Sequence, residues 1–578
     1  MAALRVWAPA ATRVDAQVDD RTLPMSPDGG GWWSLENVAE GAAVGPGADY
    51  GFCIDGAAAL PDPRSRWQPH GVHGLSRVVD DAAYEWRAAG WHGRPVLGRL
   101  IYELHIGTFT DEGTFGSAIE RLDDLVDLGV DFVELLPVAA FPGHHGWGYD
   151  GVFLYAVHEP YGGPGGLKRF VDACHLRGLG VILDVVYNHL GPDGNVLAAY
   201  GPYFTHSYAT PWGDAVNYSG PGSDEVRRFA IDNALMWLRD YRIDGLRLDA
   251  VHAIIDTSST HLLEQLAGEV AELSGLVGRP LSLIAESDLN DPRIINAPQL
   301  GGYGVGAQWS DDFHHALHVA LTGETSGYYE DFGSLSQLGT ALRRGFVFAG
   351  EYSKARDRRH GQPLPPSTVG HRLLGYAQNH DQVGNRADGE RLAALVSPAL
   401  AKVAAALVLT SPFTPMLFMG EEWGASTPWQ YFTDHEDPAL AAAVSNGRRE
   451  EFKAFGWRPD DVPDPQDPQT FRRSILNWDE RKSPPHADLL AWHRDLIELR
   501  RARPGLRDGR FDDQDVDVDE VRRLVVVTRP STVIAVNLSP QSQTLDVDAR
   551  SVLLASADAE LRDTTLTLAP ESVAILER

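Results

Sequence analysis

From about residue 99 to residue 422 the chain repeats one pattern: a short apolar run that ends in polar residues, then a loop, then an amphipathic segment. Apolar runs alternating with helical segments are typical of parallel α/β folds, whose strands are buried on both faces. Because eight runs of this kind occur, we expect a closed (β/α)8 TIM barrel rather than an open sheet. The predicted strands are residues 99–106, 131–138, 180–188, 244–251, 281–287, 306–312, 372–381 and 414–422.

The segments on either side of the barrel have a different texture. Residues 1–90 carry short alternating runs separated by Gly, Pro and Asp clusters, which predicts an N-terminal β-sandwich acting as an accessory module. Residues 91–494 form the predicted catalytic barrel, with a loop subdomain at about 190–222 after the third strand. Residues 495–578 predict a closing helix followed by a C-terminal β-sandwich.

Composition excludes several classes of function. The formal net charge is -30, from 80 acidic and 50 basic residues, so the surface would repel DNA and RNA and we expect no nucleic-acid partner. The longest apolar run, residues 401–410, falls short of the ~20 residues that a membrane span needs. The N-terminus shows no export pattern, and Cys53 and Cys174 form no disulfide framework, so we expect a cytoplasmic protein.

Acidic side chains stand at the ends of four predicted strands, where the catalytic groups of a TIM barrel lie. They are Asp184, Asp249, Glu286 and Asp381. Any one of them alone is equally well a loop or helix cap. Arg247 precedes Asp249 by two residues, so the two-residue period of a strand places its guanidinium on the same side and able to hold that carboxylate.

Two histidines and the apolar surroundings of Glu286 extend this pattern. His189 and His380 stand beside acids at the strand ends, where an imidazole can bind sugar hydroxyls, although a lone His is more often structural. Glu286 follows Leu283, Ile284 and Ala285, a setting that favours the protonated acid. One ionised and one protonated carboxyl group, ~5–5.5 Å apart, are what retaining glycoside cleavage needs.

The motifs DVVYNH (184–189), GLRLDAVH (245–252), IAES (284–287) and QNHD (378–381) together resemble the four signature regions of the α-amylase family of glycoside hydrolases. The resemblance covers roughly residues 100–480. It implies that Asp249 is the nucleophile, that Glu286 is the general acid/base, and that Asp381 binds hydroxyls of the distorted sugar. It also implies that Arg247, His189 and His380 support the cleavage subsite.

A narrower resemblance lies in residues 144–175, 283–294, 322–333, 378–386 and 412–435. They are similar to the branch of the family that hydrolyses the α-1,4 bond next to the terminal trehalose of maltooligosyltrehalose. This implies maltooligosaccharide-type substrates and trehalose as the product. It further implies that Tyr149 stacks on the sugar at the cleavage subsite and that His252 contacts the leaving-group side. We expect Trp309 and Asp312 to grip trehalose, although a core Trp and a helix cap are nearly as plausible.

Two rival functions and one departure from the family pattern accompany this interpretation. An α-1,4-glucan branching enzyme shares the WGYD segment (147–150), and a non-catalytic carbohydrate-binding protein could use an inherited barrel. Many α-amylases bind a structural calcium at the position matching Asn188. The loop subdomain here is short and offers only Asp193 and Asp214, so we expect no metal and no cofactor.

Overall fold

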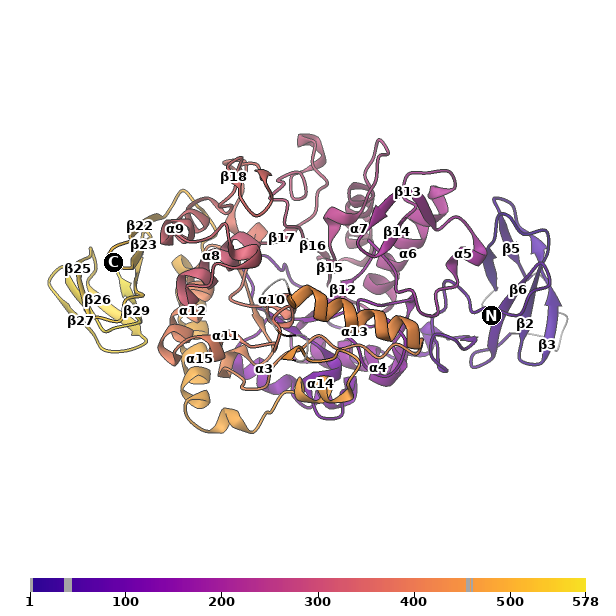
Figure 1. The fold of residues 1–578 in the computed structure, drawn as a ribbon, viewed down its shortest axis with the longest axis horizontal. Helices are drawn as coiled ribbons and strands as arrows, with labels where there is room; N and C mark the ends of the chain where they lie inside the picture. Colours follow the sequence, from indigo (N-terminus) through magenta and orange to yellow (C-terminus); the bar gives the residue numbers. More distant parts are fainter. Residues whose placement is uncertain (1–3, 36–43, 454–457, 459–460) are drawn as a thin grey trace.

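The computed structural model describes the whole chain except residues 1–3, 36–43, 454–457 and 459–460. Its centre is a closed barrel of eight parallel strands, which confirms the predicted fold class (Figure 1). Each predicted strand segment contains one of them. In barrel order the strands are β12 (Gly180–Val185), β15 (Gly245–Leu248), β16 (Ser282–Ala285), β17 (Ala307–Trp309), β20 (Leu373–Gly375), β21 (Thr414–Phe418), β8 (Ile101–Leu104) and β9 (Phe132–Leu135).

All eight strands are shorter than the predicted segments, and in two of them the difference moves residues of interest out of the strand. β17 ends at Trp309, and helix α8 (Asp311–Thr322) begins two residues later. β20 ends at Gly375, and the short helix α10 (His380–Gly384) follows after a loop. The Asn379 side chain caps α10 by accepting a hydrogen bond from the Gln382 amide at 2.8 Å. Asp381 is therefore in the first turn of a helix, not at the end of a strand.

The helices between the strands bury their apolar faces against the barrel. Their ends follow local rules: α3 stops where Gly129 adopts a left-handed conformation, and Ser397 caps α12, whose first residue is Pro398. The larger ones are α3 (Leu122–Leu128), α4 (Gly163–Leu176), α6 (Ser223–Asp240), α7 (Leu262–Val277), α9 (Leu335–Arg344), α12 (Pro398–Thr410) and α15 (His486–Ala502). None of the described helices is long and apolar enough to cross a membrane.

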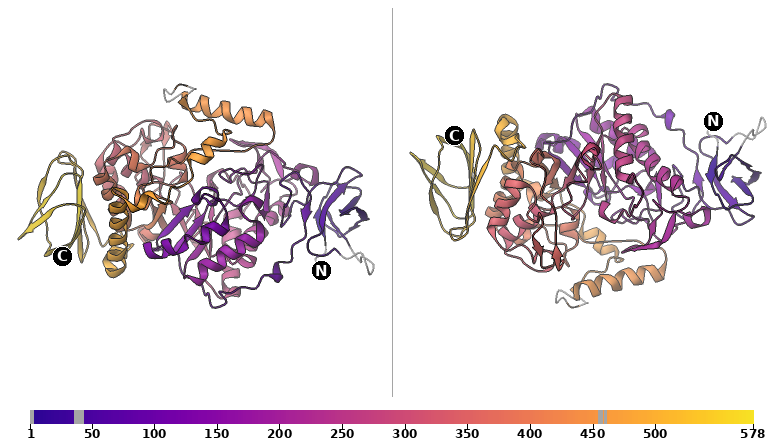
Figure 2. Two further views of the ribbon diagram at one scale, coloured as in Figure 1. Left: turned by 90° about the horizontal axis from the view of Figure 1, so that it is seen from below. Right: turned by 90° about the horizontal axis from the view of Figure 1, so that it is seen from above.

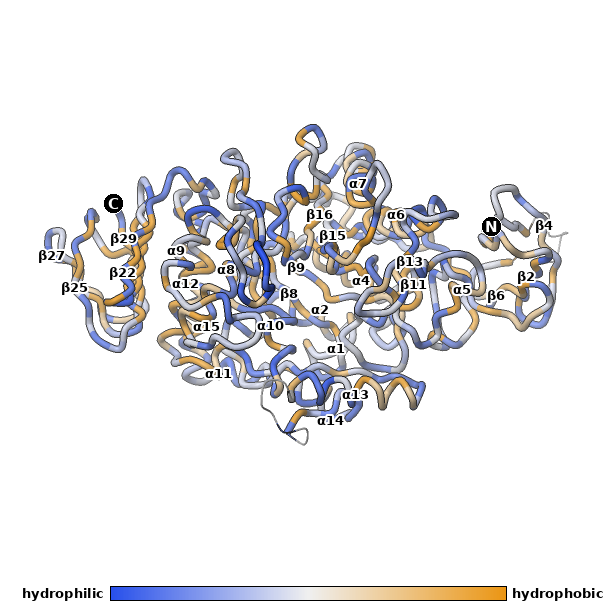
Figure 3. The backbone as a smooth tube through the Cα atoms, turned by 45° about the horizontal axis from the view of Figure 1, so that its top comes forward, coloured by the Kyte–Doolittle hydropathy of each residue, from blue (hydrophilic) through white to orange (hydrophobic). Residues whose placement is uncertain are grey.

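Antiparallel sheets lie at the two ends of the molecule (Figure 1). Figure 3 shows hydrophobic residues along the C-terminal strands, in agreement with the complete burial of β24. The N-terminal sheets are β1 (Arg5–Trp7), β5 (Trp32–Ser34), β4 (Ser26–Pro27) and β3 (Arg21–Pro24), β2 (Val14–Val18), β6 (Asp49–Ile54), β7 (Ser76–Arg77). The C-terminal sheets are β22 (Asp515–Asp519), β23 (Leu524–Thr528), β24 (Thr532–Asn537), β29 (Ser572–Glu577), β26 (Ser551–Ala555) and β25 (Gln543–Asp546), β28 (Thr565–Leu568), β27 (Ala559–Arg562).

Two excursions from the barrel help to shape the site. After β12 the chain forms α5 (Leu197–Tyr200) and the hairpin of β13 (Phe204–Thr210) and β14 (Gly213–Val216), within the predicted loop subdomain. After β21 it forms α13 (Pro438–Lys453) and α14 (Pro468–Arg473). Figure 2 shows α13 standing out on one side of the barrel in both views. The sequence analysis did not predict this helix.

Candidate active site

A cavity of about 560 Å³ opens at the carboxyl ends of the barrel strands. This volume is in the usual range for small-molecule sites. Its floor contains Asp249, Glu286 and Asp381, which the sequence analysis had singled out. The other residues around it are Trp147, Tyr149, Asp150, His189, Trp212, Ala250, His252, Asn385, Tyr431, Val444, Gly447, Arg448 and Glu451.

Arg247 is completely buried beneath this floor and links the acids of neighbouring strands. Its Nη1 donates to Asp249 Oδ1 at 2.8 Å and to the two oxygens of Asp184 at 2.8 and 2.9 Å. Its Nη2 forms an ion pair with Glu286 Oε2 at 3.0 Å. The Trp309 ring lies 4.3 Å from the guanidinium carbon. One guanidinium thus contacts both carboxyl groups, those of Asp249 and Glu286.

Backbone geometry fixes Glu286 from the other side. Its Oε2 accepts a hydrogen bond from the Ala250 amide at 2.6 Å. Ala250 directly follows Asp249 and has a φ of 37°, a left-handed conformation that costs a non-glycine residue free energy. The strained residue thus turns its amide toward Glu286 while its neighbour Asp249 faces Arg247. Glu286 Oε2 is held by this hydrogen bond and by the ion pair with Arg247.

Burial and charge act in opposite directions on the two aspartates. Burial raises the pKa of Asp249, and the Arg247 guanidinium opposes this rise. Burial likewise raises the pKa of Asp184 to about 7, again against Arg247, while Tyr149 Oη donates to Asp184 Oδ2 at 2.6 Å. Asp249 bonds a cation directly and opens onto the cavity, which suits a carboxylate that must be ionised to attack.

His380 is buried between acids and a phenol. Its Nδ1 lies 2.5 Å from Glu103 Oε1, and its backbone amide donates to Glu103 Oε2 at 3.0 Å. Its Nε2 lies 2.7 Å from Tyr149 Oη, and the two rings are stacked with centroids 5.2 Å apart. Burial disfavours the charged ring, but Asp381 and Glu103 outweigh it and raise the pKa of His380 to about 9. His380 is therefore an imidazolium at neutral pH.

Asp381 and His189 lie on either side of Tyr149. The Asp381 side chain is 34% exposed to the cavity, and its Oδ2 lies 3.5 Å from His380 Nε2. His189 Nε2 lies 3.0 Å from the backbone oxygen of Tyr149. Burial lowers the pKa of His189 to about 4, so its ring is neutral at pH 7. Both residues line the cavity, and their binding of sugar hydroxyls stays a prediction.

The structure does not bring Trp309 and Asp312 into the cavity, contrary to our expectation. Trp309 is 2% exposed and packs in the barrel core against Arg247 and Tyr376. Asp312 is also buried; its Oδ2 accepts hydrogen bonds from the Val347 and Phe348 amides and from Asn290 Nδ2. Neither side chain is placed to grip trehalose. His252 does line the cavity, with its Nδ1 3.9 Å from Asp288 Oδ1.

Sequence reasoning missed three contributors to the site. Trp212, at the tip of the β13–β14 hairpin, is 48% exposed and stacks on His189 with ring centroids 4.4 Å apart. Glu103 holds His380 from the first barrel strand, and only its place in a buried strand could have indicated this. Arg448 of α13 donates to Asn385 Oδ1 and to the carbonyl of Gly384, which ties α13 to α10.

The residues considered for a cation have other partners. Asp193 Oδ1 lies 3.1 Å from His73 Nε2, and Asp214 Oδ2 lies 2.9 Å from His206 Nδ1. Asn188 Oδ1 lies 3.2 Å from His189 Nδ1. Among the residues that the structure describes, no group of three or more His, Cys, Asp or Glu side chains could hold a metal ion.

Comparison with known proteins agrees with the barrel fold. The family description "Alpha amylase, catalytic domain" matches residues 105–200, and a domain of unknown function, DUF3459, matches residues 509–575. A solved structure titled a putative alpha amylase from Salmonella typhimurium superposes with a TM-score of 0.91 at 39% identity, covering 100% of this chain and 97% of that one. Fold and site thus define a glycoside hydrolase of the α-amylase family.

Similar curated proteins identify the family within this class of glycoside hydrolases. The malto-oligosyltrehalose trehalohydrolase of Arthrobacter ramosus is 56% identical over 538 residues, which are 93% of this chain and 92% of that protein. The protein of the same name from Mycobacterium tuberculosis is 52% identical over 581 residues, covering 100% of this chain and 99% of that protein. The chain belongs to the malto-oligosyltrehalose trehalohydrolase family.

Proposed function

We propose that this chain hydrolyses the α-1,4 bond adjacent to the terminal trehalose of maltooligosyltrehalose, with retention of configuration, and releases free trehalose. The observation that carries the proposal is the contact of one buried guanidinium, Arg247, with both Asp249 and Glu286 on the floor of the cavity. Family membership supplies the substrate class. A cytoplasmic location also belongs to this proposal, because Cys53 and Cys174 are free thiols, as expected in a reducing compartment.

The proposed reaction has two steps. Asp249 attacks the anomeric carbon, the bond to the leaving oxygen breaks, and Glu286 gives that oxygen its proton, so trehalose leaves. Glu286, now a carboxylate, then takes a proton from water, and the resulting nucleophile cleaves the glycosyl ester on Asp249. The carboxylate of Asp381 binds hydroxyls of the distorted sugar, where contacts that strengthen in the transition state lower the barrier. The sequence analysis gave His380 the same role, but its ring is buried and its two nitrogens face Glu103 and Tyr149, so it positions Tyr149 instead.

Rings that face the cavity supply apolar contact for the sugar. Tyr149 presents its ring above Arg247, held by hydrogen bonds to Asp184 and His380. Trp212 and His189 form a second stacked pair at the rim. On the leaving-group side, His252 lines the cavity and can contact the trehalose unit. Trp309 and Asp312 are buried and have no such role.

Product analysis tests this function. We expect maltotriosyltrehalose to give maltotriose and trehalose, and kcat/KM on this substrate to exceed that on linear maltopentaose by roughly ten- to several-hundredfold, as one or two mismatched polar contacts at ~1–3 kcal/mol each imply. Equal rates on the two substrates would contradict the trehalose specificity. New α-1,6 branches on amylose, without free trehalose, would assign the chain to the branching enzymes instead.

A further inference from the structure

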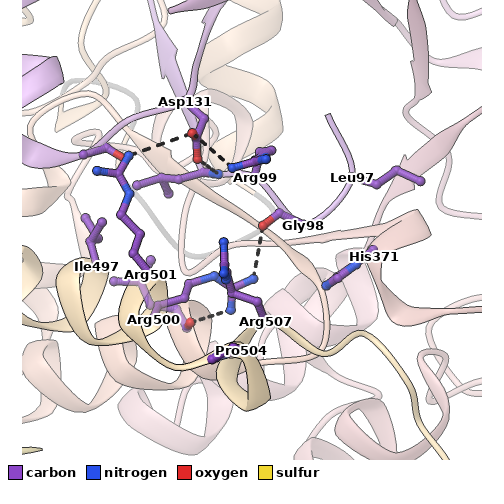
Figure 4. Close-up of a pocket in the computed structure, with 13 residues that line it drawn as sticks. Leu97, Gly98, Arg99, Asp131, His371, Ile497, Arg500, Arg501, Pro504 and Arg507 are labelled. Carbon is purple, nitrogen blue, oxygen red and sulfur yellow. Dashed lines mark hydrogen bonds and ion pairs between the residues drawn. The ribbon is translucent and has the colours of Figure 1, made fainter. Parts of the chain in front are cut away.

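A second cavity lies at the opposite face of the barrel. It has a volume of about 350 Å³. The residues just before β8, β9 and β20, at the amino ends of these three barrel strands, form part of its wall. The C-terminal end of α15 and the short helix η10 (Pro504–Arg507) close it from below (Figure 4). The residues around it are Leu97, Gly98, Arg99, Leu100, Gly129, Asp131, His371, Leu409, Ile497, Arg500, Arg501, Pro504 and Arg507.

The walls of this cavity are strongly cationic in a chain whose net charge is -30. Four arginines, Arg99, Arg500, Arg501 and Arg507, face a single acid, Asp131. Asp131 Oδ1 lies 3.8 Å from Arg99 Nη1 and 3.8 Å from Arg501 Nη2, and it accepts a closer hydrogen bond from Arg94 Nη1 at 3.0 Å. One carboxylate thus lies near three guanidinium groups. Dashed lines in Figure 4 mark two of these ion pairs, from Asp131 to Arg99 and from Asp131 to Arg501.

Carbonyls at helix ends engage two of the arginines: Arg500, and Arg501, whose Nη2 donates to the Gly129 carbonyl at 2.6 Å. Arg500 is 4% exposed and donates to the carbonyls of Leu409 and Leu506 at 2.8 and 2.6 Å, which satisfies carbonyls at the ends of two helices. Arg507 has no acceptor among the residues that the structure describes, and its Nε is buried without a partner. His371 Nε2 is also buried without a partner. The Arg507 guanidinium therefore remains as a donor for a ligand.

Burial and neighbouring positive charges lower the pKa values of groups around this cavity. Burial, together with Arg529 and Arg507, lowers the pKa of Arg500 to about 9. Burial and Arg500 lower the pKa of His371 to about 4. Arg529 is 2% exposed, and its Nε and Nη2 have no hydrogen-bond partner within the described part of the chain. A bound anion would relieve the repulsion among these cations.

We propose that this cavity binds the phosphate group of a small phosphorylated molecule. Guanidinium groups match phosphate oxygens with paired hydrogen bonds, and Arg99, Arg501 and Arg507 offer such groups from three separate segments. The cavity has room for more than a phosphate ion, so a sugar phosphate fits the same chemistry. The ligand would join the barrel to α15 and η10 and stabilise the fold there; the proposal is independent of the reaction at the other face.

Thermal unfolding and calorimetric titration of the full chain test the site. We expect inorganic phosphate and glucose 6-phosphate to raise the melting temperature in a saturable way, whereas sodium chloride of equal ionic strength and glucose do not. Tighter binding of glucose 6-phosphate would identify an organic phosphate as the occupant, and equal affinity would identify the phosphate ion. No rise beyond that in sodium chloride would overturn the proposal.

Variants locate the binding. Arg507→Gln removes a half-buried guanidinium and Arg99→Gln an exposed one, and we expect each to weaken phosphate binding at least tenfold while turnover at the other face is unchanged. Arg562→Gln is the matched control, because Arg562 is an exposed arginine that pairs with Glu560 in the C-terminal domain. Equal affinity in the wild type and both cavity variants would show that phosphate binds elsewhere.

Discussion

The sequence position of Arg247 predicts only one of the contacts that this residue makes with the acids of the site. The two-residue spacing predicted its bond to Asp249, and the structure has that bond at 2.8 Å. Its contacts with Asp184 and Glu286 depend on the closure of the barrel, which brings β12 and β16 to either side of β15. The same guanidinium therefore contacts both carboxyl groups and favours charge on Asp249.

Replacing either carboxyl group should stop the reaction. We predict that Asp249→Asn and Glu286→Gln each lower kcat on maltotriosyltrehalose by at least about 10⁴-fold, because each removes a nucleophile or a proton donor at almost constant volume. Circular dichroism and the melting temperature should show an intact fold. Asp291→Asn is the control, since Asp291 pairs with Arg293 outside the cavity. Near wild-type turnover in either site variant would refute these roles.

Trp309 and Asp312 show that a position at the end of a barrel strand does not by itself place a side chain in the active-site cavity. Both stand where a barrel strand gives way to a helix, and the sequence cannot tell whether such a side chain turns into the cleft or into the protein. Trp309 is the last residue of β17, and its ring fills the barrel next to the Arg247 guanidinium. Asp312 satisfies two amides of residues 347–348, a partner segment 35 residues away that no local pattern indicates.

At the scale of elements, the strand pattern predicted every strand of the barrel, because parallel strands buried on both faces leave continuous apolar runs. The walls of the cleft were harder to predict. The β13–β14 hairpin is mostly exposed, and α13 lies beside the cleft through contacts such as Arg448 with Asn385. These elements carry little apolar periodicity of their own, so their positions follow from tertiary contacts.

The hairpin should contribute to binding more than to catalysis. Trp212 offers an exposed ring that is already stacked on His189, so a sugar can pack on it without ordering a new side chain. We predict that Trp212→Ala raises KM for maltotriosyltrehalose by about tenfold, close to 1.4 kcal/mol, with a smaller change in kcat. Tyr208→Ala is the matched control, since Tyr208 is an exposed aromatic residue of the same hairpin that does not line the cavity. Equal KM values for the two variants would remove Trp212 from the site.

At the scale of the whole molecule, buried titratable groups give the stability a maximum near neutral pH. Burial lowers the pKa of His105 and His158 to about 3, so these rings stay neutral when folded but bind protons when unfolded, and stability falls as the pH drops below about 6.5. Glu421 behaves in the opposite way, because burial raises its pKa to about 8. His380, with its pKa raised to about 9, also holds its proton more tightly in the folded state.

These raised values predict a loss of stability between pH 7 and pH 9. A group whose pKa is raised on folding contributes stability below its unfolded pKa and loses it as the pH rises through the folded value. For Glu421 that window runs from about 4.5 to about 8, and for His380 from about 6.5 to about 9. Each pKa unit is about 1.4 kcal/mol, so we expect the free energy of unfolding in urea to fall by about 3–4 kcal/mol from pH 7 to pH 9.

One substitution separates the contribution of Glu421 from the rest. Glu421 is buried, and its Oε2 accepts a hydrogen bond from the Phe418 amide at 3.1 Å, a contact that a glutamine oxygen can also make. Glu421→Gln cannot ionise, so its free energy of unfolding should fall less steeply between pH 5 and pH 8 than that of the wild type, with little difference in slope above pH 8. Glu560→Gln, at an exposed position, should keep the wild-type slope. If the two variants lose stability equally with rising pH, ionisation of Glu421 is not the cause, and His380 must carry the alkaline loss.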